Sequence, residues 1–299
     1  MKELDISNKN CTIEQDGNVL IVTLNRPEAK NALSPAMLVG MYRAWRLLDE
    51  DDELMCGILT GKGDTFCAGM DLKQGPEGGE DADTKMIQEL MKDVPDLHWQ
   101  ALLRHNQPMK PLILAVEGYA LAGGTEILQG TDIRVGAEDA IFGVTEAKRG
   151  LFPLGGSSVR LRRQISYCQA AEILLTARHV TADEALSFGL INHMVPKGEA
   201  LQKAREIAAD ICKNGPLSIK ALMKMLREVD GSILESDALE TELAVGGPIF
   251  ATEDAREGMK AFKEKREWFG PKRKTGARGL PVKGGELFAL RDLKIQALE

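Results

Sequence analysis

The sequence predicts an α/β protein, because short apolar runs recur through its first two thirds and lead through glycine-rich turns into helical patterns. The runs Asn18–Leu24, Met55–Thr60 and Pro111–Val116 have the length and apolar or β-branched content of buried strands. After about residue 198 the strand-like runs stop and helical patterns follow one another. We therefore expect a core of alternating strands and helices over residues 1–196, a helical part over residues 197–270 and a basic, flexible tail over residues 271–299.

Composition narrows the classes of protein to consider. The chain has 299 residues, of which 43% are hydrophobic and 28% charged, as in ordinary globular proteins. Its net charge of −7 argues against a general nucleic-acid binder. Five cysteines without a C-x-x-C pair favour reduced thiols over a disulfide frame or a zinc site. No apolar run reaches the ~18 residues of a membrane span. The sequence thus predicts a soluble, cytoplasmic protein with no metal, nucleic-acid or membrane partner.

The first strand run is followed by the segment NRPEAKNALS and then by an amphipathic helix. Ser34 and Pro35 form a favoured helix start, and apolar residues continue from it at helical spacing through Trp45, which we expect in the core. Within the preceding segment, Arg26 and Lys30 could meet a phosphate group of a ligand. Each could equally be a solvated surface charge.

The second strand run leads into a segment of small residues. Cys67, Ala68 and Gly69 leave room for a bulky planar ligand, and the backbone N–H of Met70 is a candidate donor to an oxyanion.

The third strand run leads through Gly118, Gly123 and Gly124 into a helical pattern that begins near Thr125. Free N–H groups at such a helix N-terminus, helped by the helix dipole, can hold developing negative charge. Glu126 lies within one turn of this anion hole. From its position alone, it is as readily a partner of the helix dipole as a catalytic group.

The second and third segments together resemble the paired signature of the crotonase family of enoyl-CoA hydratases and isomerases. TGKGDTFCAGMDL is followed some fifty residues later by AVEGYALAGGTEILQGTDIRV, and the resemblance spans roughly Ile13 to Phe269. It implies a ββα spiral core with a C-terminal helical part that makes a trimer or a dimer of trimers. It also implies an oxyanion hole formed by the N–H groups of Met70 and Gly123. Further positions implied to contact the coenzyme A ester are Arg26, Lys30, Ala68, Gly69, Asp71, Leu72, Pro153 and Phe269.

A second acidic candidate, Glu146, follows the strand runs Asp132–Gly136 and Ala140–Val144. Its position at a strand end suits a functional carboxylate, although it could be a surface acid paired with a neighbouring basic residue. The resemblance implies that Glu146 is the second catalytic glutamate of the hydratases. The family's P-G-x-G-G motif after this residue appears here as P-L-G-G-S, with Leu154 where glycine is commoner.

The segment Gln74–Gln107 is the least regular part of the chain. Glycine and acid clustering over Gly75–Asp83 predicts a mobile loop. Resemblance to the family implies that this segment covers the acyl pocket and varies with the substrate. Some of its apolar residues are expected to line the pocket and others to form a helix core. We expect His98 and His105 to be packing or surface residues.

The later helical patterns cover about Cys168–Leu175, Thr181–Gly189, Gly198–Lys213, Leu217–Val229, Glu235–Ala244 and Thr252–Lys265, with a capping box at Thr181. The resemblance implies that the last of these ends near a neighbouring subunit's cofactor.

The resemblance implies that the protein adds water across the α,β double bond of an acyl-CoA thioester. The oxyanion donors would stabilise the thioester enolate by ~3 kcal/mol each. Glu126 would deprotonate water and Glu146 would deliver a proton to the α-carbon. Coenzyme A would enter as part of the substrate, with no further cofactor. The alternatives are a Δ3,Δ2-enoyl-CoA isomerase and, in a different class, a non-catalytic CoA- or RNA-binding homologue. The residues of the two motifs resemble those of bacterial hydratases that act on bulky or steroid-derived acyl groups.

Overall fold

The computed structural model of the chain describes residues 1–71, 82–229 and 234–266. The chain divides into two compact units, Met1–Ile249 and Phe250–Glu299. The predicted tail over residues 271–299 lies outside the described residues, and the predicted boundary near residue 196 stays a prediction.

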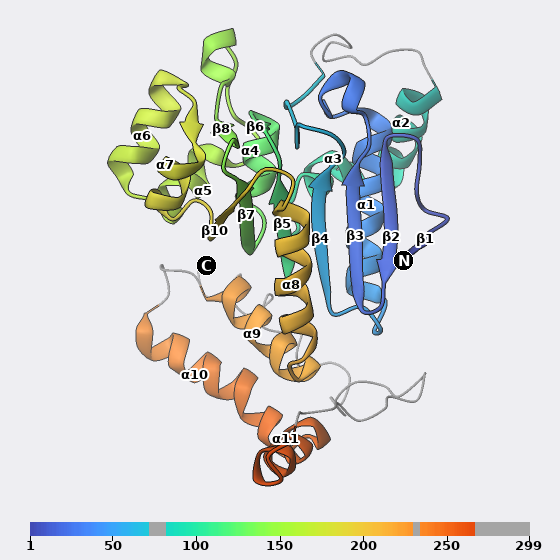
Figure 1. Cartoon of the computed structure of the whole chain (residues 1–299), viewed down its shortest axis with the longest axis vertical. Coiled ribbons are helices and arrows are strands. Elements are labelled where there is room, and N and C mark those ends of the chain that lie inside the picture. The colour runs from blue at the N-terminus through green and yellow to red at the C-terminus, as the bar shows by residue number, and fades with distance from the viewer. Residues whose placement is uncertain (72–81, 230–233, 267–299) are drawn as a thin grey trace, which may run out of the picture. The chain divides into compact units, whose positions relative to one another are not determined.

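A seven-stranded sheet forms the centre of the first unit, in the order β1-β2-β3-β4-β5-β7-β10 (Figure 1). From β3 to β10 all neighbours are parallel, whereas β1, β2 and β3 pair antiparallel. The carboxyl ends of the parallel strands therefore meet at one edge, where ligands of such sheets commonly bind. The strands are β1 (Lys2–Glu3), β2 (Cys11–Asp16), β3 (Val19–Leu24), β4 (Cys56–Gly61), β5 (Leu112–Val116), β7 (Ile133–Ala137) and β10 (His193–Val195).

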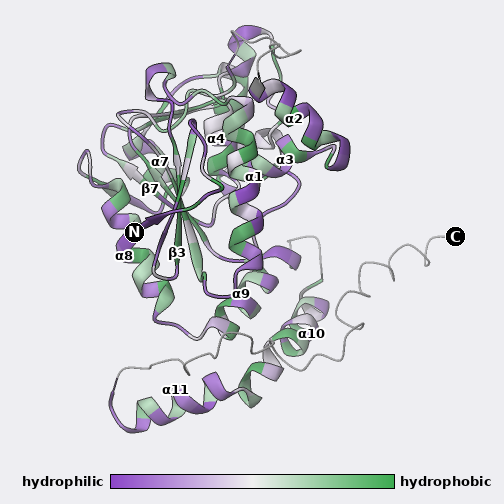
Figure 2. Ribbon diagram, turned by 90° about the vertical axis from the view of Figure 1, so that its right-hand side faces the viewer, coloured by the Kyte–Doolittle hydropathy of each residue, from purple (hydrophilic) through white to green (hydrophobic). Residues whose placement is uncertain are grey.

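Helices cover both faces of this sheet, so its central strands are apolar along their whole length (Figure 2). Helix α1 (Pro35–Glu50) packs on one face together with α2 (Ala82–Asp93) and α3 (Leu97–Ala101). Helix α8 (Ala200–Cys212) packs on the other face, against β4, β5 and β7 (Figure 1). The core position predicted for Trp45 is confirmed: the side chain is 3% exposed and its indole N–H donates to the carbonyl of Ala101 at 2.9 Å.

A second, three-stranded sheet lies beyond the carboxyl edge of the large one. It contains β6 (Tyr119–Leu121), β8 (Ile141–Gly143) and β9 (Val180–Thr181), in that order. Gly118 makes the corner between β5 and β6 with a φ of +56°, and a Cβ there would lie 2.0 Å from the carbonyl oxygen of Asp64. Only glycine permits this close approach of the two chain segments.

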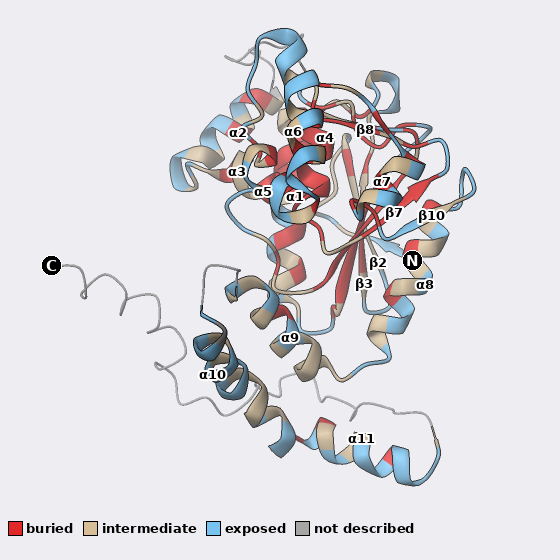
Figure 3. Cartoon of the chain, turned by 90° about the vertical axis from the view of Figure 1, so that its left-hand side faces the viewer, coloured by how far each residue is buried: buried red, intermediate tan, exposed pale blue. Residues whose placement is uncertain are grey.

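The remaining described helices are η1 (Pro27–Ala29), α4 (Gly123–Leu128), η2 (Glu146–Arg149), α5 (Ser157–Gln164), α6 (Tyr167–Thr176), α7 (Ala182–Phe188), α9 (Pro216–Glu228), α10 (Glu235–Gly246), η3 (Gly247–Ala251) and α11 (Glu253–Lys263). Among them, α6, α7, α9, α10 and α11 lie close to the predicted ranges, and η1, η2 and η3 are additional. The capping box predicted at Thr181 is present, with Glu184 as its second member. Figure 3 shows α4 as a deeply buried helix, whereas α5 has exposed, intermediate and buried residues.

Helix α9 is fixed to the sheet by a paired arginine. Arg227 Nη1 and Nη2 contact the two carboxylate oxygens of Asp132 at 2.7 and 3.0 Å, and Asp132 also accepts the N–H of Leu112 in β5. The two bonds fix the orientation of the two side chains, in addition to the attraction between their charges.

Candidate active site

Two chain segments after the carboxyl ends of β3 and β4 are fastened together by a buried asparagine. Asn31 is fully buried with a φ of +50°, a backbone conformation that asparagine tolerates better than most residues. Its side-chain amide donates to the carbonyls of Lys62 at 3.0 Å and Thr65 at 2.6 Å, while its oxygen accepts the N–H of Arg26 at 2.8 Å. The segment holding Arg26 is therefore held against the turn that leads to Met70.

The N–H groups of Met70 and Gly123 lie on neighbouring backbone segments. Leu33 N–H donates to the carbonyl of Gly69 at 2.8 Å, which sets the strand-like position of residue 70. A Cβ on Gly123 would lie 3.9 Å from the nitrogen of Met70 and 3.7 Å from the Cα of Gly69. Within the described chain, neither N–H of this pair donates a hydrogen bond. The two donors are thus available to a shared acceptor.

The residue before α4 adopts a strained backbone conformation. Ala122 has φ +50° and ψ −119° and is the N-cap of the helix, with its N–H donated to the carbonyl of Gly143 at 2.8 Å. A non-glycine residue in such a region costs on the order of 1–3 kcal/mol, and such strain is concentrated at functional sites. The turn presents Gly123 as the first residue of α4.

Glu126 lies in a cradle of backbone donors. The carboxylate is 5% exposed and accepts the N–H of Ser157, at the start of α5, at 3.3 Å. Burial raises the pKa of Glu126, while hydrogen bonds from Ser157, Gly155 and Gly156 act in the opposite direction. A Cβ on Gly155 would lie 2.4 Å from Oε2 of Glu126, so this position must remain glycine for the carboxylate to stay in place.

A buried hydrogen-bond chain behind Glu126 was missed by the sequence analysis. Gln129 Nε2 donates to Ser157 Oγ at 2.7 Å, and both side chains are almost completely buried. Since Ser157 Oγ accepts this bond, its own proton is free to point toward the carboxylate, and the hydroxyl is a hydrogen-bond partner of Glu126. No local motif signals the chain, because residues 129 and 157 are joined only by the fold.

Glu146 begins the short helix η2, directly after the strand β8 and Thr145. Burial raises the pKa of Glu146 to about 7, and the charge of Glu126 contributes in the same direction. Its Oε2 atom is buried and has no hydrogen-bond partner within residues 1–71, 82–229 and 234–266. A buried, unpaired carboxylate oxygen that interacts with a second glutamate is typical of an acid–base site rather than of a surface acid.

The positions predicted to contact coenzyme A are distributed around these groups. Arg26 forms an ion pair with Asp71 at 2.7 Å, so its guanidinium is already engaged by a carboxylate. Lys30 is exposed, with its ammonium 5.7 Å from the centre of the Tyr119 ring, and its carbonyl accepts the N–H of Ala68. Gly69 has a φ of +93°. Leu72 and Phe269 lie outside the described residues.

The loop that carries Leu154 is hydrogen-bonded to the end of the segment Gln74–Gln107. Arg104 Nε donates to the carbonyl of Leu154 at 2.6 Å, and its guanidinium lies 4.9 Å from the Trp99 ring centre. Leu154 is exposed, as are Leu151 and Phe152. Of the mobile loop predicted over Gly75–Asp83, residues 75–81 lie outside the described residues, and the last two residues of the range begin α2.

The fold and these side chains define a class of protein: an α/β enzyme with two glutamates that interact through their charges and two backbone donors that have no acceptor in the described chain. The sequence pattern of the enoyl-CoA hydratase/isomerase family matches residues 14–271. The chain belongs to this family.

Individual relatives agree with this assignment. The chain is 49% identical over 263 residues to the enoyl-CoA hydratase EchA19 of Mycobacterium tuberculosis, covering 87% of this chain and 96% of that protein. It is 35% identical to a short-chain-enoyl-CoA hydratase of Clostridium acetobutylicum, covering 86% and 96%. A crystal structure of an enoyl-CoA hydratase from Mycobacterium tuberculosis matches with a TM-score of 0.78 at 38% identity, over 88% of this chain and 98% of that one. The family, the fold and the enzyme class expected from the sequence are thereby confirmed.

No group of three or more histidine, cysteine or acidic residues is placed to hold a metal ion in the described part of the chain. Among the helices of the described ranges, none combines the length and the apolar content that crossing a bilayer would need.

Proposed function

We propose that this protein adds water across the α,β double bond of an acyl-CoA thioester, with Glu126 and Glu146 as the acid–base pair. The observation that carries the proposal is the combination of a buried and a half-buried glutamate, Glu126 and Glu146, with two backbone N–H groups that have no acceptor in the described chain. A thioester oxygen placed between Met70 and Gly123 would gain negative charge as the enolate forms, and both donors would stabilise it.

The two carboxylates differ in a way that suits opposite roles. Burial raises the pKa of both carboxyl groups, but the donors around Glu126 oppose this shift and support the ionised form that accepts a proton from water. Glu146 has a pKa of about 7, so a large fraction holds a proton near neutrality and can deliver it to the α-carbon. In dehydration the roles reverse, and ionised Glu146 removes the α-proton.

Coenzyme A is proposed to enter as part of the substrate, with no metal or redox cofactor in the reaction. Lys30 is exposed on the segment beside the oxyanion loop and is the first candidate for a phosphate contact. Arg26 would need to exchange its bond with Asp71 or share it, so we assign it a weaker role. Ala68, Gly69 and Pro153 are proposed to contact the thioester or its acyl chain through their backbone or small side chains, with Leu72 and Phe269 as further contacts.

The segment Gln74–Gln107 is proposed to set acyl-chain preference. Its described part packs on α1, and its end is bound to the loop of Leu154 through Arg104. The candidate substrates range from short chains to long or ring-bearing acyl groups, in the oxidation of fatty acids or similar lipids.

A homotrimer or a dimer of trimers is proposed as the working assembly. In the first unit, several large apolar side chains of α9 and α10 are more than half exposed, which is unusual for a stable monomer surface: Leu222, Leu226, Leu239 and Leu243. Sedimentation at micromolar concentration tests this, and a monomer would contradict it. The cysteine usage supports a cytoplasmic location.

Loss of the enoyl-thioester absorbance with crotonyl-CoA and with longer enoyl-CoA esters tests the reaction. Glu126→Gln and Glu146→Gln should each reduce hydration by at least ~100-fold. Glu53→Gln, on an exposed turn, is the matched control and should leave the rate unchanged. Wild-type hydration rates in a folded Glu146→Gln protein would contradict the proposal.

An isomerase that moves the double bond from the β,γ to the α,β position is the second candidate, because proton transfer through Glu146 alone could perform it. A β,γ-enoyl-CoA ester distinguishes the two reactions. Glu126→Gln should retain isomerisation if only Glu146 is needed, whereas hydration should be lost. Equal loss of both reactions in Glu126→Gln would show that the isomerase uses the full pair.

A further inference from the structure

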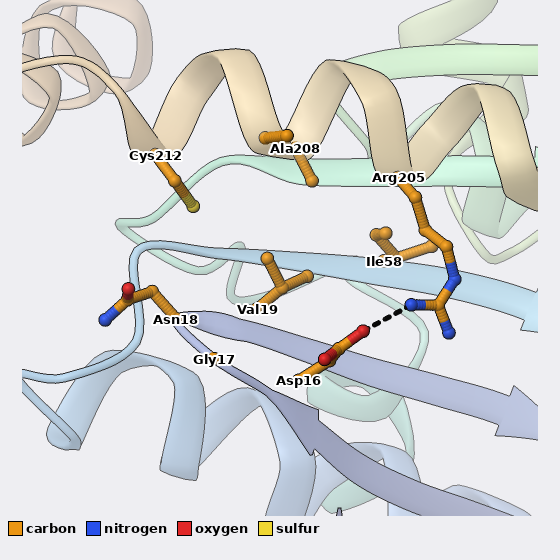
Figure 4. A pocket seen from close by; sticks show the side chains of 9 residues that line it. Asp16, Gly17, Asn18, Val19, Ile58, Arg205, Ala208 and Cys212 are labelled. Carbon is orange, nitrogen blue, oxygen red and sulfur yellow. Dashed lines mark hydrogen bonds and ion pairs between the residues drawn. The ribbon is translucent and has the colours of Figure 1, made fainter. Parts of the chain in front are cut away.

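A pocket lies between α8 and the amino-terminal ends of β3 and β4, on the opposite end of these strands from the glutamate pair. Its volume is about 290 Å³. Figure 4 shows an Arg205–Asp16 ion pair on one side and the Cys212 side chain on another, with apolar side chains between them. These apolar lining residues are Val19, Ile58, Ala208 and Ala209. The walls suit a small, largely apolar molecule.

A second thiol lies directly behind the one in the pocket. Cys212 is the last residue of α8 and is partly exposed, while Cys56 is the first residue of β4 and is fully buried. Both belong to one apolar cluster between the helix and the sheet, and the two thiols are hydrogen-bonded to each other. Cys56 is the strand partner of Val19, which lines the pocket. A molecule that enters the pocket would therefore contact Cys212 first. It would reach Cys56 only by way of Cys212.

The hydrogen bond gives the two thiols different reactivity. The bond from Cys56 lowers the pKa of Cys212, and this bond together with burial raises the pKa of Cys56. Cys212 lines the pocket and is partly exposed whereas Cys56 is buried, so Cys212 is the nucleophile of the pair, and its lowered pKa favours the thiolate that attacks. Cys11 and Cys67 are buried and have pKa values raised to about 12, and Cys168 is exposed on α6. Of the five cysteines, only Cys212 and Cys56 combine a thiol that is accessible from the pocket with a second thiol next to it.

We propose that Cys212 and Cys56 form a modification site for small, uncharged disulfides that enter this pocket. The thiolate of Cys212 attacks one sulfur of the disulfide, a mixed disulfide forms on Cys212, and the other half leaves as a thiolate that takes up a proton. Cys56 then loses its proton and attacks the Cys212 sulfur, which releases the second half as a thiol. In the balance, one small disulfide is reduced to two thiols and the two cysteines are oxidised to one disulfide.

This site is independent of the proposed hydratase reaction, because none of its residues belongs to the glutamate pair or the oxyanion loops. The cross-link would join the start of β4 to the end of α8. It would leave the carboxyl edge of the sheet unchanged.

The experiment uses the full chain carrying Cys168→Ser, so that the exposed thiol on α6 cannot react, with 2,2′-dithiodipyridine as the probe. Released thiopyridone and the intact mass are followed together. We expect two thiopyridones per chain, no retained adduct, and a linked pair of tryptic peptides, Leu47–Lys62 and Glu206–Lys213. Labelling of Cys212 should be at least ~10-fold faster than that of Cys11 or Cys67.

Two variants separate the steps. In Cys56→Ala the mixed disulfide should remain on Cys212, with one thiopyridone released. In Cys212→Ala the buried Cys56 should not react in the folded protein, as circular dichroism verifies. A stable adduct on Cys212 while Cys56 is present, or a Cys212 as slow as Cys11, would overturn the proposal. We expect the cross-linked protein to hydrate enoyl-CoA esters at an unchanged rate. A loss of hydration activity would contradict the independence of the two sites.

Discussion

Replacing Glu146 by glutamine should weaken catalysis and, at the same time, remove a pH-dependent cost to stability. The folded-state pKa of about 7 lies above the ordinary value of 4.5. At pH 7 about half of the Glu146 side chains are therefore protonated, against about one in 300 for an ordinary glutamate. The hydration kcat/KM should fall above about pH 7, where the acid loses its proton, and dehydration should fall below it.

The same pKa fixes the sign of the stability effect. A carboxyl group whose pKa is raised by folding is harder to ionise in the native state, so its ionisation destabilises the fold. The cost is absent below about pH 4.5, grows as the pH rises, and is constant above about pH 7. At about 1.4 kcal/mol per pH unit over the interval from 4.5 to about 7, it reaches about 3 kcal/mol.

Glutamine cannot ionise, and any cost of its own amide does not vary with pH. The free energy of unfolding of Glu146→Gln, measured relative to the wild type by urea titration, should thus rise by about 2–3 kcal/mol from about pH 5 to about pH 8. Hydration should fall at least ~100-fold at both pH values. Glu53→Gln serves as the control and should follow the wild type. A difference between Glu146→Gln and the wild type that does not change with pH would refute the assigned pKa and its cause.

Three further outcomes are expected. Gly155→Ala should displace the Glu126 carboxylate and lower the hydration kcat by ~100-fold in a folded protein, whereas Gly246→Ala, with open space around it, should have no effect. Ser157→Ala should shift the pH profile of kcat/KM and lower kcat by ~10-fold, and Ser157→Thr should restore most of it; a flat response would remove Ser157 from the positioning of Glu126. Arg227→Leu should lower the free energy of unfolding by about 2–4 kcal/mol because it leaves Asp132 partly buried and unpaired, and an unchanged urea midpoint would contradict this.

Four central strands of the large sheet, β3, β4, β5 and β7, could be predicted because they are local apolar runs bounded by clear turn residues, whereas β1, β2 and β10 were not predicted. The run PLILAV and the glycines after it, for example, give β5, the Gly118 corner and α4 in order. The strands of the small sheet have only two or three residues each. Such lengths carry no usable period, so β6 and β9 are visible only in the structure.

The site divides in the same way. Glu126 and Gly123 lie within one motif, and the helix start that brings them together is readable in the chain, although the catalytic role expected of Glu126 came from the family resemblance. Asn31, Gln129 and Ser157 act through partners that the fold brings together from distant parts of the sequence. Nothing local distinguishes a buried amide that joins two loops from a polar residue on the surface.

Glu117, two residues before β6, shows how the site depends on the order in which the chain is made. Its carboxylate accepts the N–H groups of Gly198 at 2.9 Å and Ala200 at 3.0 Å, at the start of α8, while its carbonyl accepts the N–H of Phe66 at 2.8 Å. One residue thus fastens the two oxyanion segments to a helix some eighty residues later in the chain. On a ribosome, both segments leave the exit tunnel well before α8 does. The Glu117 contacts can form only after α8 has emerged, so the proposed oxyanion hole would gain this support late in synthesis.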